Sequence, residues 1–474
     1  MTDVPRERSP ELDGRTAAVL ATADALAGRR FVNEALREWR AAGRLTGREA
    51  ALATEIGQGA VRHLVTIEHV LSRLARYDRA HLAPRLRAIL CTAAYQIIWM
   101  DRIPPFAAVD QAVELARRLV RGRAPTLVNA VLRRITDVLA ERRAPWHRLD
   151  PAEVRVSWEQ ACRFRVPVLP DPQPDDHAAH LAAATGERPA RYAALVERYG
   201  PARAEAVAWA SQAVPVSVLQ RNPLRATPEG FAQALRASFG ESVELVGDVA
   251  FVGPSSAILA APAFTAGLAF VQDPTAYAAA CAVAAQQGER VLDLCAAPGG
   301  KSVVLALALC DRGEIVACDR APDRLARVDE NATRLGLKCI RTQLLPDDVA
   351  DVLNLFPRFD AALVDVPCSN TGVIARRPEA RLGLTPRKLR ALVETQRHLL
   401  RRAAACLRPG GRLVFSTCSL EPEENEQVVA EFLAENPPWR LDVQETTLPA
   451  WGPRLSDWHD GGYFARLVQT TNHD

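Results

Sequence analysis

The stretch RVLDLCAAPGGKSVVLALALC, residues 290–310, places a short apolar run, a glycine turn and a helical pattern directly one after another. The same alternation of strand-like and helix-like segments continues through EIVACDR (314–320), PDRLARVDENATRLG (322–336), FDAALVDVP (359–367), PRKLRALVETQRHLLRRAAACL (386–407) and GRLVFSTCS (411–419). This rhythm predicts an α/β, doubly wound, largely parallel sheet, which binds its ligands at the carboxyl ends of the strands. We therefore expect a Rossmann-like domain over residues 286–474.

The part of the chain before this domain has a different pattern. Apolar residues recur at helical spacing through residues 15–140, with one helix expected over Thr126–Glu141, and predict an all-α bundle over residues 1–144. The proline-rich stretch VPVLPDPQPDD cannot continue a helix, so we interpret residues 145–188 as a linker. Residues 189–285 mix both patterns and predict a small α+β module.

Composition excludes several classes of protein. Apolar residues make up 48% of the 474 and charged residues 24%, which are ordinary globular proportions. No apolar run approaches the roughly 18 residues that a membrane span needs, and the polar N-terminus does not resemble a signal peptide. The ten cysteines form no C-x-x-C pair and do not cluster with histidine. We expect a soluble, cytoplasmic protein with no metal site and no membrane partner.

Positive charge is concentrated near the N-terminus. Residues 1–150 contain 25 arginines against 17 acidic residues, whereas the rest of the chain has 34 basic and 39 acidic residues. The excess lies in a stripe at Arg117, Arg118, Arg121, Arg123, Arg133, Arg134, Arg142 and Arg143. Such a stripe suits a phosphate backbone, but a solvated helix face would have the same composition. The sequence leaves both interpretations open.

The first motif with chemical meaning is Asp293-Leu-Cys-Ala-Ala-Pro-Gly-Gly-Lys301, which follows a strand and opens a helix. Asp319 ends the next strand, where an acid can hydrogen-bond a ribose diol. The turn lacks the glycine spacing of dinucleotide and phosphate loops, so a nucleoside ligand fits better, and S-adenosyl-L-methionine is the candidate. The predicted cofactor-binding residues are Cys295, Ala296, Ala297, Pro298, Gly299, Gly300, Lys301, Asp319 and Asp365.

Two further motifs follow neighbouring strands. One is Asp365-Val-Pro-Cys368, and the other is Thr417-Cys418-Ser419, which precedes an acidic helix start at Glu421–Asn425. Either cysteine alone would be a small core side chain. Two cysteines and a carboxylate at adjacent strand ends would instead face one pocket.

These stretches carry a family resemblance. DLCAAPGGK (293–301), DVPCSNTG (365–372) and STCSLEPEENE (416–426) resemble the signatures of the RsmB/NOP family of RNA cytosine-5 methyltransferases. The domain order is similar to that of bacterial 16S rRNA members of the RsmB/Sun type, which have a NusB-like helical domain before the catalytic part. Further matching stretches are EAALATE (49–55), LVNAVLRR (127–134), VQDPTA (271–276) and DGGYFARLV (460–468).

The resemblance implies a reaction and a partner. It implies S-adenosylmethionine-dependent methylation of C5 of a cytosine in 16S rRNA, cytosine 967, by a monomer that does not act on DNA. In the family, the cysteine matching Cys418 adds to C6 of the base and the one matching Cys368 assists release. Asp365 would contact the N3/N4 edge, with Lys301 close to both ligands. The residues alone do not decide which cysteine attacks, because DNA cytosine-5 methyltransferases use the cysteine of a Pro-Cys motif.

Some positions depart from the family pattern. Leu345 stands where an Asp usually contacts the adenine side of the cofactor, with Asp347 and Asp348 just beyond it, and Leu382 replaces a Trp. Two alternatives therefore remain: the same chemistry on tRNA or another rRNA site, and an RNA-binding assembly factor that has lost turnover.

Overall fold

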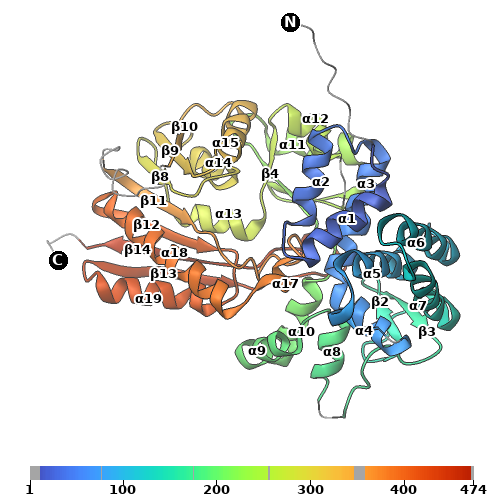
Figure 1. Ribbon diagram of the computed structural model, residues 1–474. Helices are drawn as coiled ribbons and strands as arrows, with labels where there is room; N and C mark the ends of the chain where they lie inside the picture. The colour runs from blue at the N-terminus through green and yellow to red at the C-terminus, as the bar shows by residue number, and fades with distance from the viewer. Residues whose placement is uncertain (1–10, 76, 175, 255–256, 346–357, 471–474) are drawn as a thin grey trace, which may run out of the picture. The chain divides into compact units, whose positions relative to one another are not determined.

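The computed structural model describes residues 11–75, 77–174, 176–254, 257–345 and 358–470 (Figure 1). The chain divides into two compact units. The helical unit comprises Met1–Ala213 together with Arg381–Gly383, and the α/β unit comprises Val214–Ala380 and Leu384–Asp474. Among the described residues, no helix is both long and apolar enough to span a bilayer.

The helical unit begins with a bundle, as the apolar spacing predicts. Buried small and branched side chains such as Ala17, Ala21 and Val61 form one of its cores. The prediction of an all-α N-terminal region is confirmed over its helices, which are α1 (Gly14–Leu26), α2 (Val32–Ala41), α3 (Gly47–Arg62), α4 (Leu64–Leu74), α5 (Pro84–Trp99), α6 (Pro105–Leu119) and α7 (Ala124–Val138), with a 3-10 turn η1 (Arg79–His81).

The end of this bundle differs from the prediction. Helix α7 ends at Val138, and the residues expected to continue it to Glu141 lie in strand β1 (Leu139–Pro145). Strand β1 pairs antiparallel with β3 (Gln160–Phe164), which also pairs with β2 (Glu153–Arg155). Tertiary contacts oppose the helical pattern, because the guanidinium of Arg142 donates to the carbonyl oxygens of Ile103 (2.9 Å) and Gln96 (3.3 Å), at and beyond the C-terminal part of α5.

The range expected to be a linker, residues 145–188, contains regular structure: β2, β3 and α8 (Ala178–Ala184). Aromatic packing holds the sheet, since the guanidinium of Arg155 lies 3.8 Å from the ring centroid of Trp146 and 4.7 Å from that of Trp158. The helices α9 (Pro189–Tyr199) and α10 (Pro201–Ala210) also pack in the helical unit. The four-part division therefore stays a proposal about functional parts, whereas the chain packs as two units.

The α/β unit is built on a seven-stranded sheet of order β10-β9-β8-β11-β12-β14-β13. The first five strands are parallel, and β14 pairs antiparallel with both β12 and β13. This confirms the predicted doubly wound fold. The strands are β8 (Arg290–Asp293), β9 (Glu314–Asp319), β10 (Ile340–Leu344), β11 (Phe359–Asp365), β12 (Leu407–Thr417), β13 (Trp439–Thr447) and β14 (Gly462–Gln469).

Helices cover both faces of this sheet (Figure 1). On β11, Ala362 and Val364 pack against one set of helices, and Leu363 between them packs against the other. This alternation explains why the parallel strands are apolar throughout. The helices are α18 (Pro386–Ala405) and α19 (Glu426–Glu435) on one face, and α13 (Pro274–Cys281), α14 (Gly300–Ala308) and α15 (Pro322–Leu335) on the other.

A second, four-stranded antiparallel sheet of order β5-β6-β4-β7 precedes the large sheet in the chain. Its core includes Leu219, Phe231 and Val252. Its elements are β4 (Ser217–Arg221), α11 (Pro228–Phe239), β5 (Val243–Val246), β6 (Val249–Val252), the 3-10 turn η3 (Ile258–Ala260), α12 (Pro262–Thr265) and β7 (Ala269–Val271).

Candidate active site

The loop between β8 and α14 needs glycine at two positions. Gly299 has a φ of +103°, and a Cβ there would lie 3.1 Å from the Cα of Val328. A Cβ on Gly300 would lie 2.0 Å from Oε1 of Gln272. The paired glycines of the motif therefore let the loop pack closely against α15 and against the residue that follows β7.

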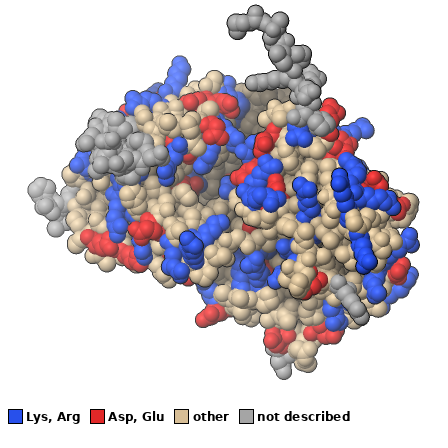
Figure 2. All heavy atoms as spheres, in the orientation of Figure 1, with Lys and Arg blue, Asp and Glu red and all other residues tan. Residues whose placement is uncertain are grey.

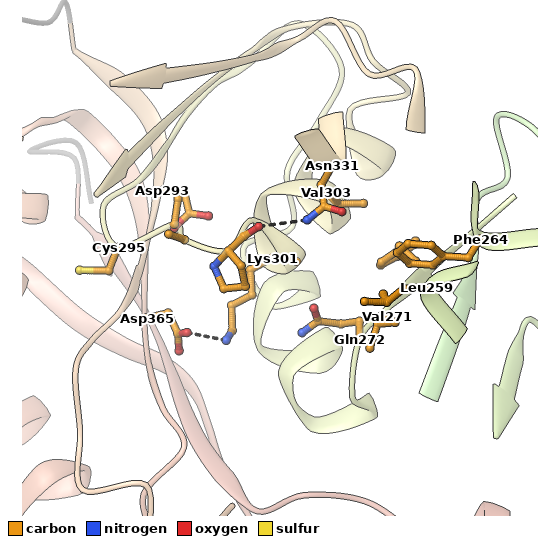
Figure 3. A pocket seen from close by; sticks show the side chains of 15 residues that line it. Leu259, Phe264, Val271, Gln272, Asp293, Cys295, Lys301, Val303, Asn331 and Asp365 are labelled. Carbon is orange, nitrogen blue, oxygen red and sulfur yellow. Dashed lines mark hydrogen bonds and ion pairs between the residues drawn. The ribbon is translucent and has the colours of Figure 1, made fainter. Parts of the chain in front are cut away.

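A cavity of about 340 Å³ lies beside this loop (Figure 3). One side is polar, formed by Asp293, Lys301 and Asp365 together with the loop itself, and the other side is apolar. Its lining residues are Leu259, Phe264, Phe270, Val271, Gln272, Asp293, Cys295, Ala296, Ala297, Pro298, Gly300, Lys301, Val303, Asn331 and Asp365. The cavity thus opens at the carboxyl ends of β8 and β11.

Asp293 supplies an unusual acceptor to this cavity. Its side chain is fully buried, and its Oδ2 accepts a hydrogen bond from the Ser302 hydroxyl at 2.6 Å. Its Oδ1 has no hydrogen-bond partner among the described residues. Burial, with a smaller contribution from the charge of Asp365, raises the pKa of Asp293 to about 7. A buried acceptor without a partner suits a ligand that brings its own N–H or O–H donor.

Asp319 lies at the end of the neighbouring strand β9. Its carboxylate accepts from the backbone N–H groups of Ala321 (3.1 Å) and Ala297 (3.3 Å), which ties the glycine loop to β9. Leu345 donates its backbone N–H to the carbonyl of Asp319, but its side chain is buried in the hydrophobic core. Asp347 and Asp348 lie outside the described residues.

Lys301 and Asp365 form an ion pair, with 2.7 Å between Nζ and Oδ2 (Figure 3). The other oxygen of Asp365 accepts from the Ser416 hydroxyl at 2.9 Å. Burial alone would lower the pKa of Lys301, but the charge of Asp365 and their hydrogen bond hold that pKa above its usual value. The cavity therefore contains a fixed ammonium and a carboxylate oriented by two donors.

The two motif cysteines lie side by side. Cys368 follows β11, Cys418 follows β12, and their Sγ atoms are 3.2 Å apart. Asn370, with a φ of +62°, spans both loops: its Nδ2 donates to the carbonyl of Cys368 (2.9 Å), and its Oδ1 lies 3.3 Å from Sγ of Cys418. The hydrogen bond with Cys418, burial, and the charges of Cys418 and Glu424 raise the pKa of Cys368 well above its usual value. The parallel pairing of β11 with β12 places both thiols in one site.

The predicted residues thus gather at one edge of the sheet, although not all line the cavity. Gly299, Asp319, Cys368 and Cys418 are absent from its lining. Sequence reasoning missed Gln272 and Asn331, which line it, and missed Glu424, which is buried behind the cysteine loops. Gln272 and Glu424 both lie in stretches that matched the family, so the motifs contained them without indicating their contacts.

One cluster in the helical unit has metal-ligand spacing within the part of the chain that the structure describes. The ligand atoms of His147, Asp150 and Glu153 lie within 4.8 Å of one another. Arg163, however, already pairs with Glu153 at 2.7 Å, which places a cation where a metal would bind. The prediction of no metal site stays a prediction.

The arginine stripe separates into two parts. Six arginines of α6, α7 and their connection have exposed side chains and form what we call the arginine face: Arg117, Arg118, Arg121, Arg123, Arg133 and Arg134. Blue side chains gather over this part of the helical unit in Figure 2. Arg142 and Arg143 are half-buried and donate to backbone carbonyls, including those of Ile103 and Trp99. Within the stripe, the arginine face is the part whose side chains are exposed to solvent.

Comparison with known proteins agrees with this architecture. A family model described as 16S rRNA methyltransferase RsmB/F matches residues 280–452, and a NusB family model matches residues 14–137. The probable ribosomal RNA small subunit methyltransferase B of Synechocystis sp. is 31% identical over 402 residues, covering 84% of this chain and 83% of that protein. The ribosomal RNA small subunit methyltransferase B of Klebsiella pneumoniae is 29% identical over 443 residues, covering 90% and 92%.

The fold has a relative among solved structures as well. The crystal structure of PH0851 superposes with a TM-score of 0.71 and 21% identity, covering 96% of this chain and 99% of that one. Sequence, domain order and sheet therefore agree, and the resemblance inferred from the motifs is confirmed. The chain belongs to the 16S rRNA methyltransferase RsmB/F family and is a methyltransferase with a NusB-family region before its catalytic α/β unit.

Proposed function

We propose that the protein methylates C5 of a cytosine in 16S rRNA, cytosine 967 by the family resemblance, through a covalent bond between Cys418 and C6. The observation that carries the proposal is the pair of thiols, 3.2 Å apart, which follow β11 and β12, together with Asp365 at the end of β11, the ion-pair partner of Lys301. A thiol pair beside an oriented carboxylate suits covalent activation of a pyrimidine. The relatives whose names include rRNA methyltransferase support RNA as the substrate class.

The reaction needs such a nucleophile because C5 of cytosine is unreactive toward a methyl sulfonium. Addition of the Cys418 thiolate to C6 forms a C–S bond and moves the ring electrons to C5, so that one difficult step becomes two easier ones. Asp365 would hold the N3/N4 edge of the base, with Lys301 keeping the carboxylate in place. After methyl transfer, a base takes the C5 proton, the C–H electron pair restores the C5–C6 double bond, and the electrons of the C–S bond leave with the sulfur of Cys418. Cys368 would assist this last step.

The described residues fit S-adenosylmethionine, which supplies an electrophilic methyl group when bound. The unpartnered Oδ1 of Asp293 can accept from the ammonium of an amino-acid ligand. Residues Cys295–Lys301 line the cavity or shape its loop, and Asp319 would accept from the ribose hydroxyls. Arg324, whose side chain is half-exposed, lies 3.6 Å from Asp319 and donates to the carbonyl of Ala297 at 2.8 Å.

RNA would approach a monomer through the arginine face. The six exposed arginines lie in the region that matches the NusB family model. Their charge provides sequence-independent attraction for a phosphate backbone, while the cysteine site selects the base chemistry.

The experiment compares two single-cysteine variants with 16S rRNA and the methyl donor. Cys418→Ala should give neither methylated RNA nor a protein–RNA adduct. Cys368→Ala should still attack and methylate, but release slowly, so that an adduct survives a denaturing gel. The reverse pattern would exchange the two roles. Turnover by the wild type without an adduct from either variant would exclude covalent catalysis.

The substrate itself is tested by bisulfite sequencing of total rRNA and tRNA from cells with and without the gene. A single cytosine of 16S rRNA should lose its protection from deamination. Loss at a tRNA or another rRNA site would reassign the substrate, and no change at any site would indicate an assembly factor without turnover.

A further inference from the structure

Glu424 is a buried carboxylate directly behind the two cysteine loops. It ends the 3-10 turn η4 (Pro422–Glu424), and its exposed fraction is 0%. Its two oxygens accept from four groups, namely the backbone N–H of Ser369 (2.9 Å), the Ser369 hydroxyl, the Ser419 hydroxyl (2.5 Å) and Nε2 of Gln396 (3.0 Å). A carboxylate that only accepts hydrogen bonds in this way is held in a fixed orientation.

These contacts hold Cys368 from both sides. On the C-terminal side, Ser369 bonds Glu424 directly. On the N-terminal side, Nε2 of Gln396 donates to the carbonyl of Pro367 at 3.0 Å as well as to Glu424. The backbone on either side of the thiol is therefore linked to one anionic side chain, directly through Ser369 and indirectly through Gln396.

The loop of Cys418 is attached to the same carboxylate. Its neighbour Ser419 donates a hydroxyl to Glu424. A second link joins the loops, because the Thr371 hydroxyl accepts from the backbone N–H of Leu420 at 2.9 Å. Glu424 therefore accepts hydrogen bonds from both loops, which a backbone bond from the N–H of Gly372 to the carbonyl of Cys418 (2.9 Å) also joins.

The two thiols consequently lie in different electrostatic surroundings. The negative charge of Glu424 faces Cys368 and is one of the contributions, after the hydrogen bond with Cys418 and burial, that raise the pKa of Cys368. Cys418 lies instead within the influence of the Lys301 ammonium, which the Asp365 carboxylate holds in place. Among the described residues, the charged groups that act on the two thiols or on Lys301 include Glu424, Asp365 and Asp293.

We propose that Glu424 is the positioning residue that assigns the roles of the two cysteines. Its carboxylate fixes the Cys368 loop and disfavours negative charge beside that sulfur, so that Cys418 is the sulfur that attacks the base. This inference rests on the proposed function, since it explains how that reaction selects its nucleophile. The segments Ser369–Asn370 and Glu423–Asn425, which follow the two cysteines, then affect the reaction by positioning the thiols. Glu424 acts through them and not by contact with the base.

The test is residue-resolved alkylation of the full-length protein, without RNA or cofactor. Wild type, Glu424→Gln, Glu424→Asp and Glu423→Gln are treated with substoichiometric iodoacetamide between pH 6 and 10, and each cysteine is quantified by peptide mass spectrometry. Glu423→Gln is the matched control: it removes the same charge one residue away, and Glu423 has no hydrogen bond to either loop among the described residues.

We expect Cys418 of the wild type to be alkylated at lower pH than Cys368. Glu424→Gln should raise the rate at Cys368 relative to Cys418 about tenfold near pH 8, the change that one pKa unit gives. Glu424→Asp should restore most of the wild-type ratio because it keeps the charge, and Glu423→Gln should not change it.

Two results would overturn the inference: faster alkylation of Cys368 than of Cys418 in the wild type, or an unchanged ratio in folded Glu424→Gln. If Glu424→Gln does not fold, the wild-type pH series and Glu424→Asp still decide, because each predicts preferential alkylation of Cys418. A wild type that shows this order but never methylates RNA would refute the proposed function and leave the charge assignment intact. A wild type that methylates RNA but does not alkylate Cys418 before Cys368 would refute the role of Glu424 and leave the proposed function intact.

Discussion

The cysteine site and the arginine face use charge in opposite ways. At the site, the charged groups are buried and paired at fixed distances, as Lys301 is with Asp365 and as Glu424 is with its four donors. On the arginine face, the side chains are exposed to solvent, and the ion pairs of Arg117 with Glu114 and of Arg118 with Asp13 are exposed as well. Function in the first region should depend on single atoms, whereas function in the second should depend on the sum of charges and on salt.

The largest effect is expected for Asp365→Asn, which removes a single charge at the cysteine site. The isosteric amide keeps its neighbours but loses the charge that orients Lys301 and holds the base edge, so turnover should fall by roughly 100-fold or more. Methyl transfer to 16S rRNA is measured under single-turnover conditions. The control is Asp360→Asn on the same strand, where Asp360 accepts from the backbone N–H of Arg290 and pairs with Arg408. Equal losses in both variants would mean that Asp365 is only structural.

The next largest effect concerns the arginine face. Reversing Arg117, Arg121 and Arg133 to Glu should weaken RNA binding at low salt by at least about tenfold. The dependence of log affinity on log salt should become shallower by about 2, or about 0.7 for each lost phosphate contact to a single strand. Cofactor affinity should not change. Filter binding at several salt concentrations measures both quantities.

Arg142→Gln is the matched arginine variant, because Arg142 donates its N–H groups to backbone carbonyls instead of facing solvent. It should lower the thermal midpoint without changing the salt dependence. If the triple reversal leaves RNA affinity unchanged, the arginine face is only a solvated helix surface.

A smaller effect is expected at Asp319. Asp319→Ala should weaken binding of S-adenosylmethionine about tenfold, since a charge-assisted hydrogen bond to the ribose is lost. Calorimetry measures the affinity, with exposed Asp323→Ala on α15 as the control. Unchanged affinity in Asp319→Ala would assign the ribose contact to Asp347 or Asp348.

The smallest effect is a change in how stability depends on pH. Asp293 has a pKa of about 7 in the folded protein, above its value of 3.8 elsewhere, so its stabilising contribution is present at low pH and is lost as pH rises toward 7. Asp293→Asn cannot ionise and still accepts from Ser302. Between pH 5 and 7, the wild type should lose up to about 1.4 kcal/mol more per pH unit than this variant in urea unfolding. Parallel pH curves would contradict the assignment.

Much of the α/β unit could be predicted because its information is local. Each parallel strand is an apolar run buried on both faces, and each motif follows such a run, so the cysteines could be placed in one site from strand order alone. The antiparallel strands β13 and β14 lack this regularity. Strand β13 has mostly exposed side chains, so it lacks the apolar run that marks each parallel strand.

The missed features have tertiary causes. The apolar spacing continues a helical pattern into Leu139–Pro145, but this segment forms a strand. Its Arg142 donates to a backbone carbonyl just beyond the end of α5. The acidic segment from Glu421 to Asn425 has the composition of a solvated helix start, yet Glu424 is buried because Ser369, Ser419 and Gln396 supply its donors. Composition describes how polar such a segment is and does not identify its partners.

The membership of Arg381–Gly383 in the helical unit has a consequence for how the protein is synthesised. Arg381 is buried, pairs with Glu187 at 3.3 Å and donates to the carbonyl of Arg62 at 2.8 Å. During translation, residues 1–213 leave the ribosome well before residue 381. The helical unit therefore lacks the buried guanidinium of Arg381 until most of the α/β unit has been synthesised. Cleavage at a single peptide bond after residue 213 would accordingly yield a helical fragment that lacks this cation. The helical unit therefore completes its folding only when the α/β unit has been synthesised.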